Sequence, residues 1–464
     1  MKILSLPTGF KLLNFLVIIF PISFFFGNLL VNLEIFLICI VGILTFQKKI
    51  FLEKNKIILL LVLFFALVII ATAFDLFYKD PQNKSLIKSI LYLRYLVLIF
   101  VLTCFFKSGK FNFKYFLYSC AICSSLIAVD LIFQYLSGTS FFGNEKIDLS
   151  TFKTQNIKTG GYLQRFAIIP LFFLPLFLKN QKNILLISLI SLTVFFSAIL
   201  FSANRMPLVM YLVFIVLSII LIKELRLPFL IGLISCVIVF ATVFNTDKDF
   251  KLYYESFYGN AITIIPNIVE HINKKYPELS KDRYFVGDLV TGEHGGEKKG
   301  QVVVGEDRTK LDKKFDIIGQ GSGHVIIYLT AIDTLQDSLF IGHGIKSFRV
   351  KCLGTLYLPN RVCGSHPHNY YLELLNDVGL VGTFLLLAVI IYLLLNIFKL
   401  RKLKTGEKLS CCCFAILLMI EFFPLKSSGS FFSTQNSCFV FLMLAMMMNY
   451  KFLTFGDSGK KYSF

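Results

Sequence analysis

The sequence predicts an all-α polytopic membrane protein with about twelve transmembrane helices and one large outer loop domain between the ninth and tenth helices. Hydrophobic residues make up 56% of the 464-residue chain and charged residues only 16%, and the mean hydropathy is +0.72. A soluble domain is about 25% charged. The apolar residues recur in runs near 20 residues, the length at which a helix crosses a bilayer. These observations exclude a soluble enzyme and a disordered chain.

The apolar runs place the twelve expected spans along the chain. They are expected at roughly 11–27, 29–46, 57–77, 88–106, 112–136, 163–179, 184–201, 206–223, 227–245, 371–398, 410–424 and 436–453. The chain is thereby divided into residues 1–245 with spans one to nine, a polar loop domain at 246–370, and residues 371–464 with spans ten to twelve and a tail. Within the loop, 286–324 is rich in Gly and Lys and is expected to be mobile, and 325–339 has the spacing of an amphipathic helix.

The charge distribution gives the orientation. The net charge of +19 could indicate nucleic-acid binding, but membrane proteins keep Lys and Arg in cytoplasmic loops and become basic for that reason alone. With the N-terminus inside, the inner segments hold most of the Lys and Arg residues that lie outside the long loop. Both termini are therefore expected on the cytoplasmic side and the loop 246–370 on the outer side. No cleavable signal peptide is expected.

The cysteines and histidines are distributed unevenly. All cysteines except Cys352 and Cys363 fall in expected spans, where Cys is usually a small apolar filler. A disulfide between these two suits an oxidising compartment and would contribute about 3 kcal/mol; two free thiols are the alternative. The six histidines all lie in the long loop, which argues against a proton relay through the membrane. They are His271, His294, His324, His343, His366 and His368.

Several ionisable residues lie within the spans, each nearer the outer end. They are Glu34, Asp75, Arg94, Asp130, Arg165 and Glu421. Arg205 occupies the short outer turn between spans seven and eight. Such residues are costly in lipid and are usually functional or paired, so they predict a polar cavity open to the outer face. Arginine binds phosphate oxygens bidentately, which suits a lipid phosphate or pyrophosphate. The alternatives are that each arginine pairs with a carboxylate, as Arg94 with Asp75 or Asp130, and that Arg205 is an interfacial anchor.

His368 directly precedes the longest span. A helix over 370–398 would measure about 43 Å at 1.5 Å per residue, so its first turns should project outward and leave His368 at the membrane surface. Imidazole can act as a general base near neutral pH. A structural cap or a metal site are the alternatives, but His366 and His368 alone supply too few ligands for a metal.

At these residues the sequence resembles the O-antigen ligase and O-antigen polymerase family of bacterial inner-membrane glycosyltransferases. The family signature is His-Asn, nine residues, Gly, two residues, Gly, and here it is formed by His368-Asn369, Gly379 and Gly382. Asn204 stands where the family usually has an acidic residue, and the insertion 286–324 has no family counterpart. The segments 342–349 with the following Cys pair and 200–205 also resemble the family, and two weaker matches are found at 160–165 and 422–432.

The resemblance implies transfer of a glycan from a polyprenyl-pyrophosphate carrier to an acceptor hydroxyl, such as a lipid A-core sugar, at the periplasmic face. His368 would accept the acceptor proton, and Arg205 would neutralise charge on the departing pyrophosphate. Further substrate-binding residues would be Arg165, Arg94, Asn369 and Arg349. No cofactor or metal is implied, since the first outer turn at Gly27-Asn28 lacks the carboxylate that a metal-dependent transferase would place there.

Three functions remain open at this point. A ligase and a polymerase share the family signature and differ in the acceptor, with a slight preference for the ligase. A transporter of lipid-linked glycan is the alternative of a different class, but it would place its charges near the midplane on broken helices. The outward position of the ionisable residues favours the enzyme.

Overall fold

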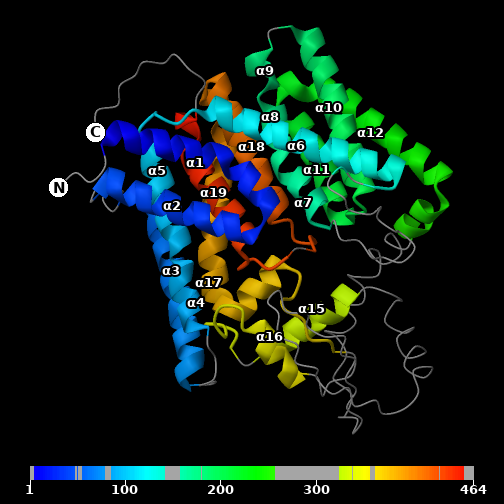
Figure 1. The fold of residues 1–464 in the computed structure, drawn as a ribbon. Coiled ribbons are helices and arrows are strands. Elements are labelled where there is room, and N and C mark those ends of the chain that lie inside the picture. Colours follow the sequence, from blue (N-terminus) through cyan, green and yellow to red (C-terminus); the bar gives the residue numbers. More distant parts are fainter. Residues whose placement is uncertain are drawn as a thin grey trace, which may run out of the picture.

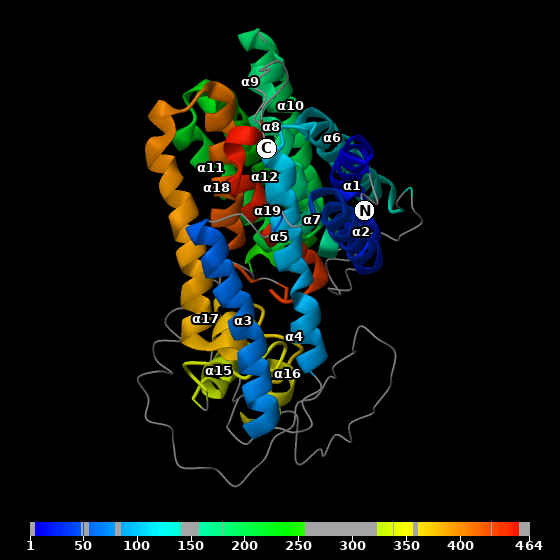
Figure 2. The ribbon, with the colours of Figure 1, turned by 90° about the vertical axis from the view of Figure 1, so that its left-hand side faces the viewer.

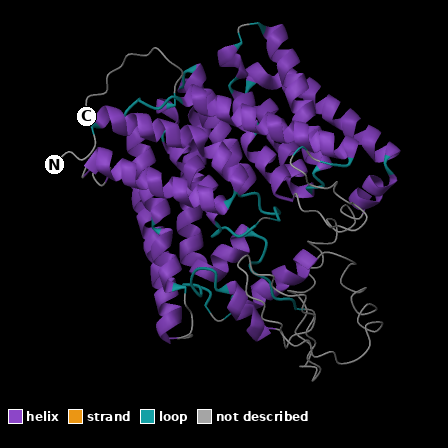
Figure 3. Ribbon diagram, viewed as in Figure 1, coloured by secondary structure: helices purple, strands orange, loops and turns teal. Residues whose placement is uncertain are grey.

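The computed structural model describes residues 5–47, 50, 55–78, 85–139, 141, 157–178, 180–255, 323–336, 338–355, 361–427 and 429–453. Within these ranges the chain is helical with connecting loops and no strand (Figures 1 and 3). The all-α prediction is confirmed for this part of the chain. The stretch 286–324, predicted to be mobile, lies outside the described residues as far as residue 322.

The helices follow the expected spans closely. The N-terminal half contains α1 (Leu6–Phe26), α2 (Asn28–Phe46), α3 (Lys56–Tyr78), α4 (Leu86–Tyr92), α5 (Arg94–Lys107), α6 (Phe113–Ser137), α7 (Ile157–Phe166), α8 (Ile168–Phe172), α9 (Leu174–Phe177), α10 (Gln181–Phe201), α11 (Arg205–Leu221) and α12 (Arg226–Thr246). The C-terminal half contains α15 (Gly323–Thr334), α16 (Phe348–Lys351), α17 (Tyr370–Leu394), α18 (Thr405–Glu421) and α19 (Thr434–Met448). Short 3-10 helices are η2 (Lys223–Leu225), η4 (Cys352–Thr355), η5 (Leu395–Lys402) and η6 (Tyr450–Phe452).

Nine helical segments in the described ranges are long and apolar enough to cross a membrane, and α11 and α19 are shorter apolar helices. The multi-pass class is therefore confirmed. Two expected spans are interrupted. The fourth breaks at Leu93 into α4 and α5. The sixth is divided into α7, α8 and α9, where Pro170 and Pro175 lack the N–H that a continuous helix requires.

The core of the bundle is the helix α19. Every residue from Ser437 to Met447 is buried, as expected of a helix that is apolar on all sides and surrounded by others. It packs against α2, α5 and α18, and most of α18 is buried as well. Because of this central position, several neighbouring helices pack around α19.

A smaller group of elements extends from one end of the bundle. Figure 2 shows α3, α4 and the beginning of α17 reaching past the other helices toward α15 and α16, and α17 packs along α3 and against α15 and α16. The described part of the long loop is fixed to α3 through Asp75. Its Oδ1 lies 3.0 Å from Lys351 Nζ and 3.5 Å from His343 Nδ1, and the carboxylate is fully buried.

Gly379, the first glycine of the signature, kinks α17. Its backbone has φ +66° and ψ −171°, a conformation almost restricted to glycine. The loop before α16 supplies the hydrogen bonds that the kink removes from the helix. Leu380 N donates to Leu339 O at 2.9 Å, and Gly344 N donates to Asp377 O at 2.8 Å. The signature glycine therefore allows the long loop to dock against α17.

Replacing Gly379 by alanine should destabilise the protein by more than the roughly 1–3 kcal/mol that such a backbone costs a non-glycine residue. The added Cβ would also overlap backbone atoms of Phe340. Thermal unfolding in detergent is the measurement. Gly161→Ala is the control, because its Cβ would meet no atom within 4 Å and alanine favours the helix. Equal melting of the Gly379 variant and the wild type would contradict this explanation.

Candidate active site at the start of α17

Asn369 begins α17 as its N-cap. Its side-chain Oδ1 accepts from Tyr371 N at 3.0 Å and from Leu372 N at 3.2 Å, which are bonds that asparagine commonly forms at this position. The side-chain Nδ2 donates to Pro424 O at 2.8 Å. Asn369 therefore joins the start of α17 to the α18–α19 loop, and its predicted role in substrate binding stays a prediction.

His368 has an uncommon backbone conformation. Its φ is +54°, which few residues other than glycine adopt, although histidine does so more often than most. Residues held in such conformations cluster at active sites. The side chain is half-buried, and its ring lies 4.1 Å from the ring of His366, centroid to centroid. The residue in this uncommon conformation directly precedes the N-cap of α17.

Glu421 is the centre of a buried network beside this helix start. Its side chain is 1% exposed and accepts from Tyr370 Oη at 2.7 Å, Arg165 Nη2 at 2.5 Å and Lys426 Nζ at 2.9 Å. Three donors, two of them charged, stabilise the ionised carboxylate. Arg165 is thus paired with a carboxylate, as the pairing alternative expects of each arginine, although the sequence did not identify Glu421 as the partner. Tyr370, two residues after His368, joins the network to the first turn of α17.

Lys426 lies below the surface of the α18–α19 loop. It is 7% exposed, whereas the preceding Leu425 is 57% exposed. Burial lowers the pKa of the Lys426 ammonium group, and the neighbouring Glu421 carboxylate opposes that effect. Neither Lys426 nor Glu421 was predicted from the sequence as a catalytic or binding residue. The sequence feature that pointed to this region was the position of Glu421 near the outer end of its span.

Arg205 is the first residue of α11 and is held by Tyr253. Its Nη2 donates to Tyr253 O at 2.9 Å, and its guanidinium lies 3.6 Å from the centroid of the Tyr253 ring. The Tyr253 hydroxyl donates to Ala203 O at 2.5 Å. Burial raises the pKa of Tyr253, and Arg205 partly offsets this, so the hydroxyl stays protonated as that donor requires. Tyr253 gave no signal in the sequence.

The segments that carry Arg165 and Arg205 lie against each other. A Cβ at Gly160 in α7 would overlap Ser202 Oγ and would lie 2.7 Å from Asn204 Cβ. The absence of a side chain at Gly160 therefore lets the turn before α11 pack on α7. Both segments are ones in which the sequence resembles the ligase and polymerase family.

Arg94 is the first residue of α5. It donates from Nη1 to Leu91 O and from Nη2 to Tyr95 Oη, both at 3.0 Å. The alternative in which Arg94 pairs with Asp75 or Asp130 is wrong. Asp75 is engaged by the long loop, as described above, and Asp130 accepts from a backbone N–H at 2.7 Å. These carboxylates are used to fix loops, which the sequence could not show.

Arg349 lies apart from the Glu421 network. It is exposed on the short helix α16 and is close enough to Lys346 to affect it, because burial and the Arg349 charge both lower the pKa of the Lys346 ammonium. The structure therefore does not bring all the predicted site residues together. Arg165 belongs to the Glu421 network, and His368 and Asn369 directly precede its Tyr370 in the chain. The turn before Arg205 packs on Gly160 of α7, and Arg349 belongs to the loop docked on α3.

Cys352 and Cys363 form a disulfide, with 5.3 Å between their Cα atoms. The bond joins the start of η4 to the segment that leads to His368, and Cys352 is packed with Ala331 and Phe348 in a small core of its own. It thereby links the docked loop to the start of α17.

Thiol labelling of intact cells should miss both cysteines until a reductant is added, because the two sulfurs are bonded and the loop is expected outside the cytoplasm. Replacing both by serine should lower the free energy of unfolding by about 3 kcal/mol, the usual contribution of a disulfide that closes so short a loop. Efficient labelling without reductant would contradict the disulfide, and a cytoplasmic signal from a reporter fused at Lys299 would contradict the orientation.

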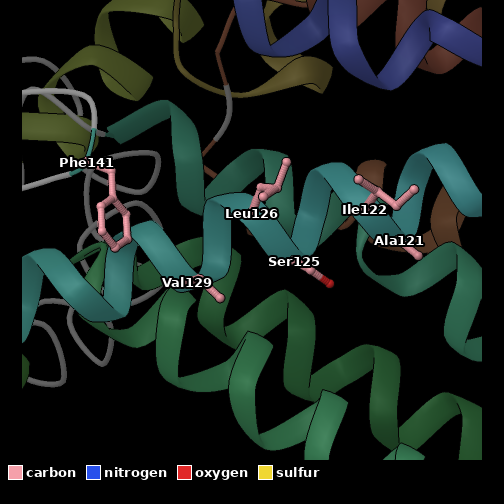
Figure 4. Close-up of a pocket in the computed structure, with 6 residues that line it drawn as sticks. All are labelled: Ala121, Ile122, Ser125, Leu126, Val129 and Phe141. Carbon is pink, nitrogen blue, oxygen red and sulfur yellow. The ribbon is translucent and has the colours of Figure 1, made fainter.

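The described part of the chain holds no group of three or more His, Cys, Asp or Glu residues arranged to bind a metal ion. A shallow hollow of about 560 Å³ lies on α6, and Figure 4 shows five of its side chains spread along that helix, with Phe141 beyond the helix end. Its lining is apolar apart from Ser125, so it is not the polar cavity predicted from the sequence. The lining residues are Ala121, Ile122, Ser125, Leu126, Val129 and Phe141.

The fold and these residues define a class of protein: a multi-pass helical membrane protein with a histidine directly before one helix start and a buried carboxylate beside that start that binds an arginine and a lysine. The family is more specific. Residues 186–387 match the model of a family described as O-antigen ligase, and the resemblance to the O-antigen ligase and polymerase family is thereby confirmed. The match contains Arg205, the disulfide and the His368–Gly382 signature, whereas Arg94, Arg165 and Glu421 lie outside it. No curated protein matches the chain.

Proposed function

We propose that this protein is a glycosyltransferase of the O-antigen ligase type. It would transfer a glycan from a polyprenyl-pyrophosphate carrier to an acceptor hydroxyl, such as a lipid A-core sugar, at the periplasmic face of the inner membrane. The observation that carries the proposal is the position of His368 inside the matched family domain, two residues from the Tyr370 that bonds the Glu421–Arg165 network.

In the proposed reaction the acceptor oxygen attacks the anomeric carbon of the glycan, and the bond from that carbon to the pyrophosphate oxygen breaks. His368 accepts the proton of the acceptor hydroxyl, a role usually worth 10²–10⁴-fold in rate. Arg205 and Arg165 stabilise the negative charge that develops on the leaving pyrophosphate. Asn369, Arg94 and Arg349 are the remaining proposed binding residues.

The proposed topology has twelve crossings, so that α11, α18 and α19 also span the bilayer despite their length. Both termini are then cytoplasmic, and the loop domain 246–370 is periplasmic. The proposed chemistry uses no metal, because arginines neutralise the negative charge on the leaving pyrophosphate. Purified enzyme should keep its activity in a chelator, and a strong loss would favour a metal-dependent mechanism instead.

A polymerase that extends the lipid-linked glycan is the second candidate, since it shares the family domain. Deletion of the gene separates the two. A ligase mutant should lack glycan on its lipid acceptor and accumulate lipid-linked polymer, whereas a polymerase mutant should still transfer single repeats to the acceptor. Loss of surface glycan with lipid-linked glycan retained on the cytoplasmic side would favour a transporter.

A further inference from the structure

Two cations share one carboxylate beside the first turn of α17. Arg165 and Lys426 both bond Glu421, and their side chains are only 14% and 9% exposed. With Tyr370 neutral, the cluster carries one net positive charge. A buried charge that lacks a full counter-charge is costly, so the cluster is suited to receive an anion.

Another carboxylate in the same region does not supply that charge through a direct bond. Glu373, in the first turn of α17, instead accepts from Ser430 Oγ at 2.5 Å and from Phe431 N at 2.6 Å. Lys426 has three N–H donors and uses one on Glu421. It directly follows the exposed Leu425 in the α18–α19 loop, so a ligand that displaced this part of the loop would meet the ammonium group.

We propose that Lys426 is a further binding residue for the donor pyrophosphate, and that Glu421 is the positioning residue that holds Lys426 and Arg165 close enough to bind one anion. The inference rests on the proposed function, which supplies the pyrophosphate. It explains why the two cations Arg165 and Lys426 share a single carboxylate. That carboxylate is also bonded by Tyr370, the residue that directly follows the Asn369 cap.

The test uses the full-length protein in lipid nanodiscs and two probes, polyprenyl pyrophosphate and the uncharged polyprenol of the same length. Lys426→Gln should weaken binding of the pyrophosphate at least tenfold, which corresponds to about 1.4 kcal/mol, and should leave polyprenol binding unchanged. Lys426→Met should give the same result without adding a buried amide, and Lys426→Arg should recover part of the preference because it keeps the charge. Glu421→Gln should also lose the preference, with partial rescue in Glu421→Asp.

Lys408→Gln is the matched control. Lys408 pairs with Glu224 at 3.3 Å at the opposite end of α18, so its loss should change neither affinity. If Lys426→Gln and Lys426→Met both keep the wild-type preference for the pyrophosphate, the inference is overturned while the proposed function stands. Parallel loss of both probes would overturn it too, because that outcome indicates a structural role. A wild type that does not prefer the pyrophosphate would overturn the proposed function and the inference with it.

Discussion

Replacing His368 by alanine is expected to lower glycan transfer by at least about 10²-fold, the usual contribution of a general base. Binding of the lipid-linked donor should change little, because the proposed pyrophosphate contacts lie with Arg205 and Arg165. The measurement compares initial transfer rates and donor affinities of purified proteins. The start of α17 should keep its structure in this variant, because the capping hydrogen bonds are made by Asn369 and not by the side chain at position 368.

His366→Ala is the matched control, because its ring lies beside that of His368 yet its backbone lacks the left-handed conformation. It should cost less activity. Transfer by the wild type should also fall as the pH is lowered, since only the neutral imidazole accepts a proton. The assignment fails if His368→Ala stays active while His366→Ala does not, or if donor binding and transfer disappear together in His368→Ala.

Arg205→Ala should abolish transfer with little loss of protein from the membrane. The guanidinium is the group expected to stabilise the departing pyrophosphate, and removal of one such donor typically costs 10²–10³-fold in rate. Arg205→Lys should rescue activity only in part, because an ammonium cannot reproduce the planar fork of the guanidinium. Near-normal transfer by Arg205→Ala would show that the residue is merely an interfacial anchor.

Tyr253 offers a control for the orientation of Arg205. Tyr253→Phe keeps the ring under the guanidinium and the backbone carbonyl that accepts from Nη2, and it should retain most activity. Tyr253→Ala removes the stacking, which is worth about 0.5–2 kcal/mol, and should give an intermediate loss. If both variants behave like Arg205→Ala, the tyrosine hydroxyl has a role beyond its bond to Ala203.

Local sequence patterns predicted the helices well. Apolar runs near 20 residues placed every expected span on a helix, because burial in lipid depends on composition over one continuous segment. The interruptions were harder to predict. The break at Leu93 has no proline and depends on packing, whereas Pro170 and Pro175 were visible in the sequence as possible breaks in the sixth span.

The partners of the buried charges could not be predicted. Arg94 was given Asp75 or Asp130 as a possible partner, yet Asp75 is engaged by the loop that contains Lys351. Arg165 meets Glu421 across 256 residues of sequence. The periodicity of one helix shows which face carries a charge, but not which helix comes to lie against it.

The sequence by itself determined that this is a multi-pass helical membrane protein, and it predicts that the chemistry lies at His368 and the outer arginines. Composition, run length and motif spacing are local properties, so they can be read without a fold. Only the tertiary structure showed that Gly379 receives the docked loop, that Tyr253 orients Arg205, and that Glu421 gathers Arg165, Lys426 and Tyr370. Each of these depends on contacts between segments far apart in the chain, where packing and the cost of burying unpaired charge select the partners.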